Sequence, residues 1–512
     1  MATCVSRAQP LPRPWGGRVT TLSINGATVP ALVLPARQGL YYGGAWHEPR
    51  LGRTGRVEDP ATGESLAEVA VASPEDVDTI VAAARSGFAS WREVTPLERG
   101  RILREVAQII RRNGPELAML DSADSGNPYR EMLPDAESAA AFVDFFAGLV
   151  TEMKGSSVPM GPDRVNFTVR EPLGVVARIL PFNHPLLFCA GKSAAILAAG
   201  NSVIIKPPEQ APLSALRLAE LAGHLFPAGV FNVIPGNREV AAALAAHPGI
   251  AKVALVGSVA AGRAVLRAAA DTVKPALLEL GGKNALIAFP DADPGAVADA
   301  VVRGMNFGWC GQSCGSTSRA FIHEDIHDAV VTRVRDLVRA YQPGLPTDPA
   351  TTMGAIVSRA QYERVLHYIQ TARDEGGHLV SGGERPSSPA LAKGYFIQPT
   401  VFSEVTSSMT IAREEIFGPV LAILRWRDEA VMLSEVNQPH YGLTCSIWTR
   451  DLVTAHRTVQ RVEAGFVWVN EVGRHFLGAP FGGYKQSGLG REECLDELLA
   501  FTQEKNVHIR LA

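Results

Sequence analysis

The chain has 512 residues, a length that accommodates two or three domains with well-formed cores. Apolar residues make up 46% and charged residues 20%, which is ordinary for a globular protein. The net charge is −3, and the sequence holds neither a basic run typical of nucleic-acid binding nor an apolar stretch of membrane-spanning length. We therefore expect no nucleic-acid partner, no membrane partner and a cytoplasmic location.

The cysteines are scattered through this large chain. They are Cys4, Cys189, Cys310, Cys314, Cys445 and Cys494. A disulfide framework would be unusual at this size and density, so a reducing compartment is favoured. Cys310 and Cys314 have a spacing that a metal site could use, but no second Cys/His pair of suitable spacing lies nearby. We therefore expect no metal.

The N-terminal segment contains arginines but no acidic residue before Glu48. Acid-poor segments that contain arginine can be organelle transit peptides. A disordered extension, or a start site placed too early, is the alternative, and the many Pro and Gly residues favour it. Residues 1–40 are therefore interpreted as an N-terminal extension.

Helical periodicity dominates the stretch that follows. Ser73-Pro74-Glu75-Asp76 is typical of a helix start, and that helix is expected to reach Trp91. Residues 97–112 and 138–153 are helical in pattern as well. We expect these helices to pack on the sheet of a first domain.

From residue 174 onward, apolar runs of strand length alternate with helical segments. The expected elements are strand 174–180, helix 186–199, strand 202–205, helix 214–226, strand 230–234, helix 240–246, strand 253–256 and helix 260–271. This alternation predicts right-handed crossovers and a parallel sheet of the nucleotide-binding type. Strand 285–289 and helix 294–307 continue the rhythm, which predicts a second α/β domain.

The turns after these strands offer sites for a dinucleotide, although the sequence has no G-x-G-x-x-G fingerprint. Strand 253–256 ends in Gly257-Ser258, and such a turn lets backbone amides approach a phosphate. Lys206 and Glu209 follow strand 202–205 directly. A carboxylate in that place accepts hydrogen bonds from ribose hydroxyls and repels a 2′-phosphate, which favours NAD over NADP. The alternative is an exposed Lys–Glu pair with no ligand.

Residues able to perform covalent catalysis stand in segments of small residues. Cys314 lies within 311–319, and Glu279 lies upstream within 278–283. A thiol nucleophile and a carboxylate base are a recurring pair. Each has an ordinary alternative, because free cysteines are usually buried hydrophobes and Glu279 could be an edge-facing polar residue of a strand. Asn183, before His184-Pro185, could serve only its turn.

The order of several separated motifs is more specific than any one residue. They are Pro181-Phe182-Asn183-His184-Pro185, Ile205-Lys206-Pro207-Pro208-Glu209, Gly257-Ser258, Leu278-Glu279-Leu280-Gly281-Gly282-Lys283, Gly311-Gln312-Ser313-Cys314, Glu414-Glu415-Ile416-Phe417-Gly418-Pro419-Val420 and Pro480-Phe481-Gly482-Gly483-Tyr484-Lys485. From roughly residue 40 to the C-terminus, this series resembles the aldehyde dehydrogenase superfamily, in particular its hydrolytic members that do not acylate coenzyme A.

The resemblance implies an α/β fold with a Rossmann-like cofactor domain, a second α/β catalytic domain and a small β flap for oligomerisation. The implied boundaries are 41–153 and 172–282 for the NAD-binding domain, 283–486 for the catalytic domain, and 154–171 and 487–512 for the flap. A homodimer or a homotetramer is expected on the same basis.

The resemblance also implies an oxidation of an aldehyde to a carboxylic acid. Cys314 would form a thiohemiacetal and then a thioester, and Glu279 would activate the water that hydrolyses it. Asn183 and the backbone N–H of Cys314 would stabilise the oxyanion. Lys192 and Glu492 would belong to a proton relay, with a surface lysine as the alternative for Lys192. A non-catalytic structural or binding relative is the alternative for the whole chain.

The cofactor residues follow by the same resemblance. They are Pro181, Phe182, Lys206, Glu209, Gly236, Gly257, Ser258, Leu280, Glu415 and Phe417. Lys206 and Glu209 would hold the adenosine ribose, and Glu415 with Phe417 would position the nicotinamide ribose.

The substrate pocket would include Gly191, Arg474, His475 and Phe481. Gly191 stands where many relatives carry a bulky aromatic residue, which suggests a widened tunnel for a bulky or aromatic aldehyde. Arg474 and His475 could instead meet an acidic end of the substrate or stay solvated. Cys310 is either a packing residue or an oxidation partner of Cys314.

Overall fold

The computed structural model describes residues 21–24 and 27–511. Most of the predicted N-terminal extension, including Cys4, lies outside the described residues. The part that is described begins with an antiparallel pair of strands, β1 (Thr21–Ile24) and β2 (Ala27–Pro30). No helix of this described part is both long and apolar enough to cross a membrane.

The first large sheet has eight strands within the described chain. Its order is β21 (Gly488–Leu489), β13 (Ala276–Glu279), β12 (Lys252–Val256), β9 (Val175–Ile179), β10 (Ser202–Lys206), β11 (Phe231–Val233), β3 (Leu40–Tyr42) and β4 (Ala45–His47). The strands from β13 to β11 are parallel, whereas β21, β3 and β4 pair antiparallel at the two ends. The parallel strands are buried on both faces, as their mostly apolar sequences require, and Arg178 in β9 and Asn232 in β11 are buried polar residues within them.

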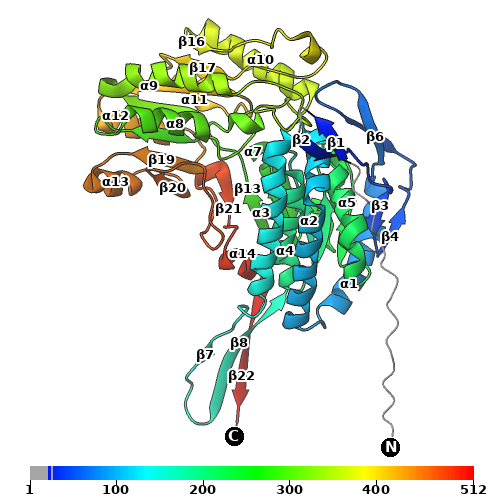
Figure 1. Cartoon of the computed structure of the whole chain (residues 1–512). Coiled ribbons are helices and arrows are strands. Elements are labelled where there is room, and N and C mark those ends of the chain that lie inside the picture. The colour runs from blue at the N-terminus through cyan, green and yellow to red at the C-terminus, as the bar shows by residue number, and fades with distance from the viewer. Residues whose placement is uncertain (1–20, 25–26, 512) are drawn as a thin grey trace, which may run out of the picture.

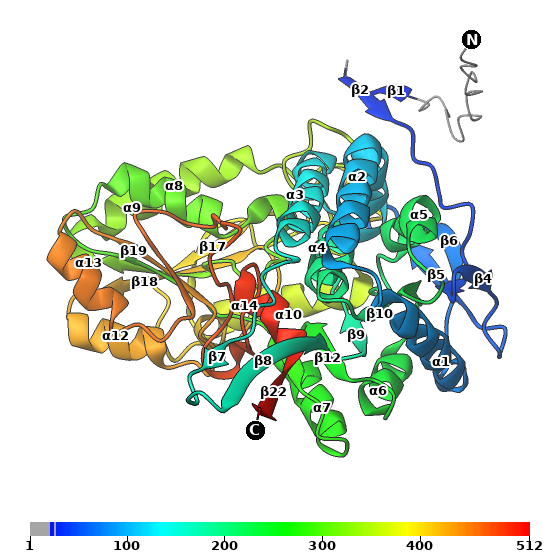
Figure 2. The ribbon, with the colours of Figure 1, turned by 90° about the horizontal axis from the view of Figure 1, so that it is seen from below.

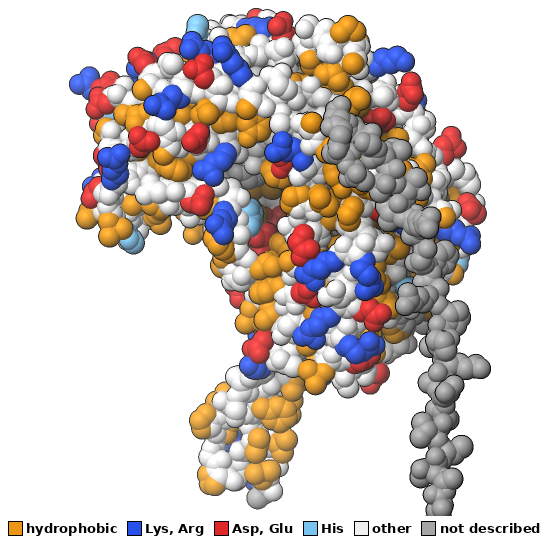
Figure 3. Space-filling model, viewed as in Figure 1, with side chains coloured by type: hydrophobic (Ala, Val, Ile, Leu, Met, Phe, Trp, Pro, Cys, Tyr) orange, Lys and Arg blue, Asp and Glu red, His pale blue; other side chains and the backbone are white. Residues whose placement is uncertain are grey.

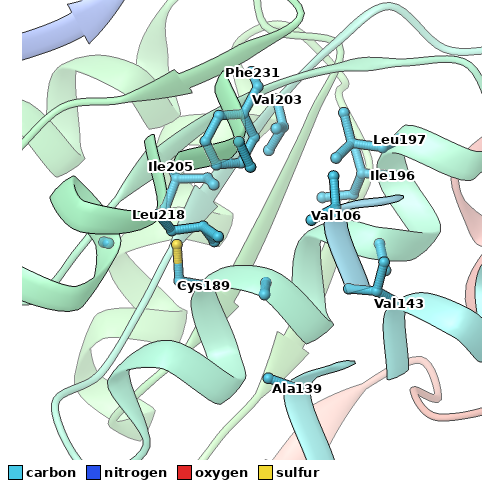
Figure 4. Close-up of a cluster of buried hydrophobic side chains, with 14 of the residues drawn as sticks. Val106, Ala139, Val143, Cys189, Ile196, Leu197, Val203, Ile205, Leu218 and Phe231 are labelled. Carbon is cyan, nitrogen blue, oxygen red and sulfur yellow. The ribbon is translucent and has the colours of Figure 1, made fainter. Parts of the chain in front are cut away.

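Helices cover both faces of this sheet (Figures 1 and 2). One face carries α1 (Pro74–Trp91), α6 (Arg238–Ala246) and α7 (Val259–Ala270), and the other carries α4 (Pro185–Ala198) and α5 (Leu213–Ala222). Outside α4 lie α2 (Pro96–Ser125) and α3 (Tyr129–Gly148). Figure 4 shows the core between these layers, where Val106 and Val143 approach Leu197 and Cys189 packs near Leu218.

The second large sheet has seven strands in the described chain and is parallel except for one edge strand. Its order is β16 (His378–Ser381), β17 (Thr400–Ser403), β18 (Val420–Trp426), β15 (Arg319–His323), β14 (Ala285–Ala288), β19 (Thr444–Trp448) and β20 (Phe466–Val469). One face packs on α8 (Pro294–Gly304) and α9 (Glu324–Leu337). The other packs on α10 (Arg359–Asp374), α11 (Thr410–Arg413) and α12 (Glu429–Asn437), while α13 (Leu452–Val459) lies beside β19.

A small sheet extends from the body as an arm (Figure 1). It joins β7 (Ser157–Val158), β8 (Arg164–Pro172) and the C-terminal β22 (Thr502–Arg510), all antiparallel. The preceding helix, α14 (Leu495–Ala500), packs on α4. A separate hairpin, β5 (Thr54–Glu58) and β6 (Ser65–Ala70), lies near the first sheet.

The predicted α/β class with parallel sheets is confirmed, and the predicted helix 74–91 matches α1. Two predicted helices before residue 174 have wrong bounds. The helix expected to end at residue 112 continues through Pro115, and the one expected from residue 138 begins at Tyr129. Tertiary packing explains the first difference, because Gly114 faces Ala136 of α3 and the two long helices support each other along their length.

Candidate active site

The residues with predicted chemistry come from loops at the ends of strands in the two large sheets. Asn183 lies in the turn between β9 and α4, Glu279 is the last residue of β13, and Glu415 precedes β18. Cys314 follows the 3₁₀ turn η2 (Phe307–Trp309). Asn183 and Glu279 lie at the carboxyl ends of parallel strands in the first sheet, where ligands commonly bind. Cys314 precedes β15 and Glu415 precedes β18, so both lie at the amino ends of strands in the second sheet.

The backbone around Cys314 is held by Asn284, which sequence reasoning missed. The Asn284 Nδ2 donates to the Cys314 carbonyl at 2.6 Å and to the Ser316 carbonyl at 2.9 Å. Upstream, Cys310 is fully buried with a positive φ of 54°, and its Sγ contacts the Ala355 carbonyl oxygen at 3.6 Å. Cys310 therefore packs in the core of the seven-stranded sheet.

Cys314 is partly exposed as a residue, but its thiol lies in a site that disfavours ionisation. Burial raises its pKa to about 12, with Glu279 and Glu415 adding to the increase and Lys192 opposing it. Glu279, Glu415 and Lys192 therefore lie near enough to Cys314 to affect the ionisation of its thiol. A cation or an ionisable base nearby is needed to produce the thiolate.

Glu279 is buried, with 4% of its surface exposed, and its Oε1 has no hydrogen-bond partner among the described residues. Burial raises its pKa well above the usual range, and the carboxylate of Glu492 contributes. Gly482 makes room for it, because a Cβ at that position would lie 2.8 Å from the Glu279 Oε1. A carboxyl group without a partner in a dry site is available for a water or a substrate atom.

Asn183 is also buried and unpaired within the described chain. Its backbone is held in place, since the Asn127 Nδ2 donates to the Asn183 carbonyl at 2.9 Å. The Asn183 Oδ1 has no hydrogen-bond partner among the described residues. The same side-chain amide carries the Nδ2 donor, the atom from which a ligand oxygen would accept a hydrogen bond.

A buried ion cluster adjoins Glu279. Glu492 lies 2.8 Å from both the Arg178 guanidinium and the Lys192 ammonium, and Arg178 is fully buried. Burial opposes ionisation of Glu492, but Arg178 and Lys192 outweigh it and lower its pKa. The predicted surface alternative for Lys192 is wrong, because only 4% of its side chain is exposed.

Two further glutamates complete this cluster, and neither was expected from sequence. Glu493 lies 3.3 Å from Lys192 and 3.1 Å from His475, and these partners overcome burial to lower its pKa to about 2. Glu497 accepts a hydrogen bond from the Glu493 backbone N–H at 2.7 Å, and burial with Glu492 nearby raises its pKa to about 8. Their signal was weak, because acidic residues near a C-terminus are usually solvated.

On the predicted cofactor side, Glu415 is fixed between glycines. Its Oε1 accepts from the Gly282 backbone N–H at 2.9 Å, and a Cβ at Gly281 would lie only 2.0 Å from its Oε2. Burial raises the pKa of Glu415 to about 7. Next to it, Phe417 packs edge-to-face on Phe182 with ring centroids 5.6 Å apart.

The residues predicted to hold the adenosine end lie at the ends of β10 and β12. Lys206 is buried, with 6% of the residue exposed, and this burial lowers the pKa of its ammonium to about 8. Within the described chain, the ammonium makes one hydrogen bond, to the neighbouring Pro207 carbonyl at 3.2 Å. Glu209 is exposed beyond it. Ser258 caps α7 by accepting from the Ala261 N–H at 3.2 Å.

The other predicted cofactor positions are close-packing or turn positions. A Cβ at Gly236 would lie 2.9 Å from the Val240 side chain. A Cβ at Gly262 would lie 2.6 Å from the Leu280 side chain, so Leu280 fills the space beside that glycine. Gly257 is partly covered in the turn before Ser258, and Pro181 is partly covered before Phe182.

The predicted substrate residues fall into two places. A Cβ at Gly191 would lie 3.1 Å from Phe142 on α3, so this glycine gives room to Phe142, a reason that sequence analysis did not consider. His475 packs on Phe481 at 4.5 Å, while the Arg474 side chain is exposed over the ring of Phe476 at 4.9 Å. Figure 3 shows a hollow between the two parts of the molecule that contain the large sheets, with histidine and acidic side chains at its mouth.

The fold has two large α/β layers, and its loops carry Asn183, Glu279 and Cys314. The aldehyde dehydrogenase family model matches residues 46–507. An aldehyde dehydrogenase of Talaromyces stipitatus, tropH, is 51% identical over 486 residues, covering 93% of this chain and 94% of its own. The chain belongs to the aldehyde dehydrogenase family, and it is an enzyme that oxidises an aldehyde.

Solved structures agree with this assignment. An NAD⁺ complex of an aldehyde dehydrogenase from Bacillus cereus has a TM-score of 0.90 at 38% identity, covering 94% of this chain and 98% of that one. A point mutant of betaine aldehyde dehydrogenase from Staphylococcus aureus, also with NAD⁺, has a TM-score of 0.90 at 33% identity, with the same coverage of 94% and 98%.

Proposed function

We propose that Cys314 is the nucleophile of this aldehyde dehydrogenase and that NAD is its cofactor. The Sγ of Cys314 adds to the aldehyde carbon and gives a tetrahedral thiohemiacetal. Bound NAD supplies the acceptor for the hydride that then leaves this carbon. A thioester on Cys314 remains, and water hydrolyses it to the carboxylic acid.

Asn183 and the backbone N–H of Cys314 stabilise the oxyanion of the tetrahedral species in this proposal. The support is that Asn183 is buried and that its backbone carbonyl is held by the Asn127 Nδ2 at 2.9 Å. Removing one preorganised donor of this kind by mutation raises the activation free energy by about 3–4 kcal/mol.

Glu279 acts as the base that takes a proton from the hydrolytic water. Its free Oε1 supports this role, and its raised pKa brings it closer to the range in which general bases are efficient. Lys192 and Glu492 serve as positioning residues that set the charge beside it. A retained base also favours hydrolysis over transfer of the acyl group to coenzyme A.

The residues at the strand ends fit a dinucleotide. The buried Lys206 ammonium has no anionic partner within hydrogen-bond distance in the described chain, and a ribose hydroxyl would satisfy it. Glu209 beyond it would repel a 2′-phosphate, which supports NAD over NADP. Glu415 and Phe417 would hold the nicotinamide ribose, with Pro181 and Phe182 facing the same space.

The observation that carries the proposal is that Gly282 joins the Cys314 segment to Glu415: its N–H donates to the Glu415 Oε1 at 2.9 Å, and a Cβ on it would lie 2.8 Å from the Cys314 carbonyl oxygen. The test is NADH formation by the purified enzyme across aliphatic, aromatic, amino and semialdehyde substrates, each with NAD and with NADP. Cys314→Ser is expected to abolish turnover with NAD binding retained. The matched control Cys310→Ser changes the neighbouring buried thiol and keeps turnover. Wild-type turnover in Cys314→Ser would refute the nucleophile assignment.

We also propose that the chain divides as 41–153 with 172–282 for NAD binding, 283–486 for catalysis and 154–171 with 487–512 for the flap. The separate sheets support this division, although β21 of the last segment pairs with β13 in the first sheet and α14 packs on α4.

The arm formed by β7, β8 and β22 is proposed to join subunits of a homodimer or homotetramer. It carries exposed apolar side chains, visible on the arm in Figure 3. They are Val158, Met160, Val165, Ile509 and Leu511. Sedimentation analysis of the wild type and of Ile509→Lys tests this, since a charge on the arm should shift the enzyme toward monomers.

We propose a cytoplasmic location because the described cysteines form no disulfide. Each cysteine that the structure describes is a free thiol, which suits a reducing compartment. Fractionation of cells that express the full chain would test this location.

A further inference from the structure

A buried histidine–aspartate pair lies directly beside Asn183. His184 stands at the N-cap of α4, and its Nδ1 is 2.6 Å from the Oδ2 of Asp135 on α3. The two side chains are 14% and 10% exposed, so the pair is shielded but not sealed. Neither residue has a role in the chemistry described above.

The ring of His184 lies among other aromatic rings next to the nucleophile segment. Its centroid is 5.3 Å from Phe188 and 5.7 Å from Trp309. Trp309 ends the turn η2, and the chain continues from there to Cys314. His184 therefore lies between the segment that carries the proposed oxyanion donor and the segment that carries the proposed nucleophile.

This pair leaves one acceptor and one donor without partners. Because Asp135 takes the Nδ1–H of His184, the neutral ring presents Nε2 as an acceptor, and no described residue bonds it. The Trp309 Nε1 is buried and has no hydrogen-bond partner in the described part of the chain. An indole N–H can only donate, and a buried donor left unpaired is unfavourable, so a ligand acceptor is the natural partner.

The surrounding charge selects among possible ligand groups. Asp135 and Glu131 both come from α3, and the Glu131 carboxyl lies 3.2 Å from where a Cβ on Gly308 would stand. Two carboxyl groups disfavour an anionic ligand at this place. A hydroxyl is uncharged, donates to an acceptor and accepts from a donor, so its chemistry suits both kinds of free atom.

We propose that His184, Asp135 and Trp309 form a subsite for a hydroxyl group carried on the ring of an aromatic aldehyde. The hydroxyl donates to the His184 Nε2 and accepts from the Trp309 N–H, while the neighbouring rings pack on the substrate ring. Asp135 acts through His184 by fixing its tautomer. This inference rests on the proposed function of Cys314 and Asn183 and names the substrate class of that site.

The test compares aldehydes that differ in one ring substituent. NADH fluorescence is followed with the full-length enzyme at saturating NAD, using benzaldehyde, its 2-, 3- and 4-hydroxy derivatives, 4-methoxybenzaldehyde and 4-carboxybenzaldehyde. At least one hydroxy isomer should exceed benzaldehyde in kcat/KM by at least about tenfold, because sites built to bond a hydroxyl discriminate strongly. The methoxy compound accepts but cannot donate, so it should not gain. A preference for the carboxy compound would overturn the proposal.

Two variants separate the subsite from a merely structural role. In His184→Phe the ratio of kcat/KM for the hydroxy isomer over benzaldehyde should fall to near one, and in Trp309→Phe it should fall several-fold. Asp78→Asn is the matched control, since it alters another His–Asp pair (Asp78 to His247, 2.9 Å) whose aspartate is exposed, and it should leave the ratio unchanged.

The results separate a failure of the hydroxyl subsite from a failure of the proposed catalytic function. If benzaldehyde is oxidised and Cys314→Ser abolishes this, but the hydroxyl ratio is near one or survives in His184→Phe, the subsite is wrong and the proposed function stands. If no aldehyde is oxidised in a manner that depends on Cys314, the proposed function itself fails. Melting temperature and NAD binding of each variant show that a lost ratio does not reflect misfolding.

Discussion

Replacing Glu279 by glutamine should stop the enzyme after its first turnover. Glutamine has nearly the same shape as the glutamate, and the Oε1 of Glu279 has no partner to lose among the described residues. We therefore expect the free energy of unfolding to change by less than about 1 kcal/mol. The thiohemiacetal and the hydride step do not need this base, so the thioester on Cys314 should still form.

The size of the effect follows from the role of the carboxylate. A positioned general base contributes roughly 10²–10⁴-fold, so steady-state turnover should fall by that factor. In the wild type, burial with Glu492 nearby raises the pKa of Glu279, and only the ionised form is a base. Hydrolysis should therefore rise with pH until that raised pKa is passed, and this rise should vanish in Glu279→Gln.

Stopped-flow measurement of NADH tests these expectations. Glu279→Gln should give a burst near one NADH per active subunit followed by slow turnover, and intact-mass analysis should find the acyl group on the protein. Glu93→Gln, which alters an exposed glutamate, is the control and should behave as wild type. A variant that turns over within about threefold of wild type, or that shows no burst while turning over slowly, would refute the assignment of Glu279 to hydrolysis.

Other parts of the site give further predictions. Arg178→Met should lower the free energy of unfolding by about 3–5 kcal/mol in urea titrations, because it leaves the buried Glu492 with one cation fewer; a loss under 1 kcal/mol would contradict the pairing. Glu497 has its pKa raised to about 8 by burial, so the folded chain binds that proton more tightly than the unfolded chain, and stability falls as pH rises from about 4.3 to 8. Glu497→Gln should flatten this decline in unfolding midpoints measured at pH 5 and pH 8, and an unchanged slope would contradict it. Gly281→Ala places a Cβ against Glu415 and should weaken NAD binding at least about tenfold by titration calorimetry, with unchanged affinity as the contrary result.

The sequence predicts most of the α/β rhythm because buried parallel strands leave short, mostly apolar runs. The strand expected at 174–180 is β9, and the turn after it was recognised from Asn183. Helix bounds were less predictable. Pro115 is an ordinary stop signal, yet α2 passes through it because α3 packs along both sides of that position.

The polar support of the site could not be predicted in the same way. Arg178 occupies a central strand and pairs with Glu492, a residue 314 positions away in the chain. Nothing local distinguishes such an arginine from one that reaches solvent at a strand end. Asn284 has the same difficulty, because its role depends on two carbonyls some 30 residues downstream. Contacts between segments distant in sequence decide these roles, and one sequence carries no record of them.

The C-terminal segment links the catalytic cluster to the arm. Between β21 and β22 the chain supplies Glu492 and Glu493 to the buried cluster and then forms α14. This stretch is fastened to the eight-stranded sheet, since the Lys252 ammonium donates to the Ala500 carbonyl at 2.5 Å and the Asn201 amide donates to the Phe501 carbonyl at 2.9 Å. The buried acids can hold their positions only while this stretch is docked, because their backbone belongs to it. Docking of this stretch therefore determines both where the arm strand β22 begins and where Glu492 and Glu493 lie in the buried cluster.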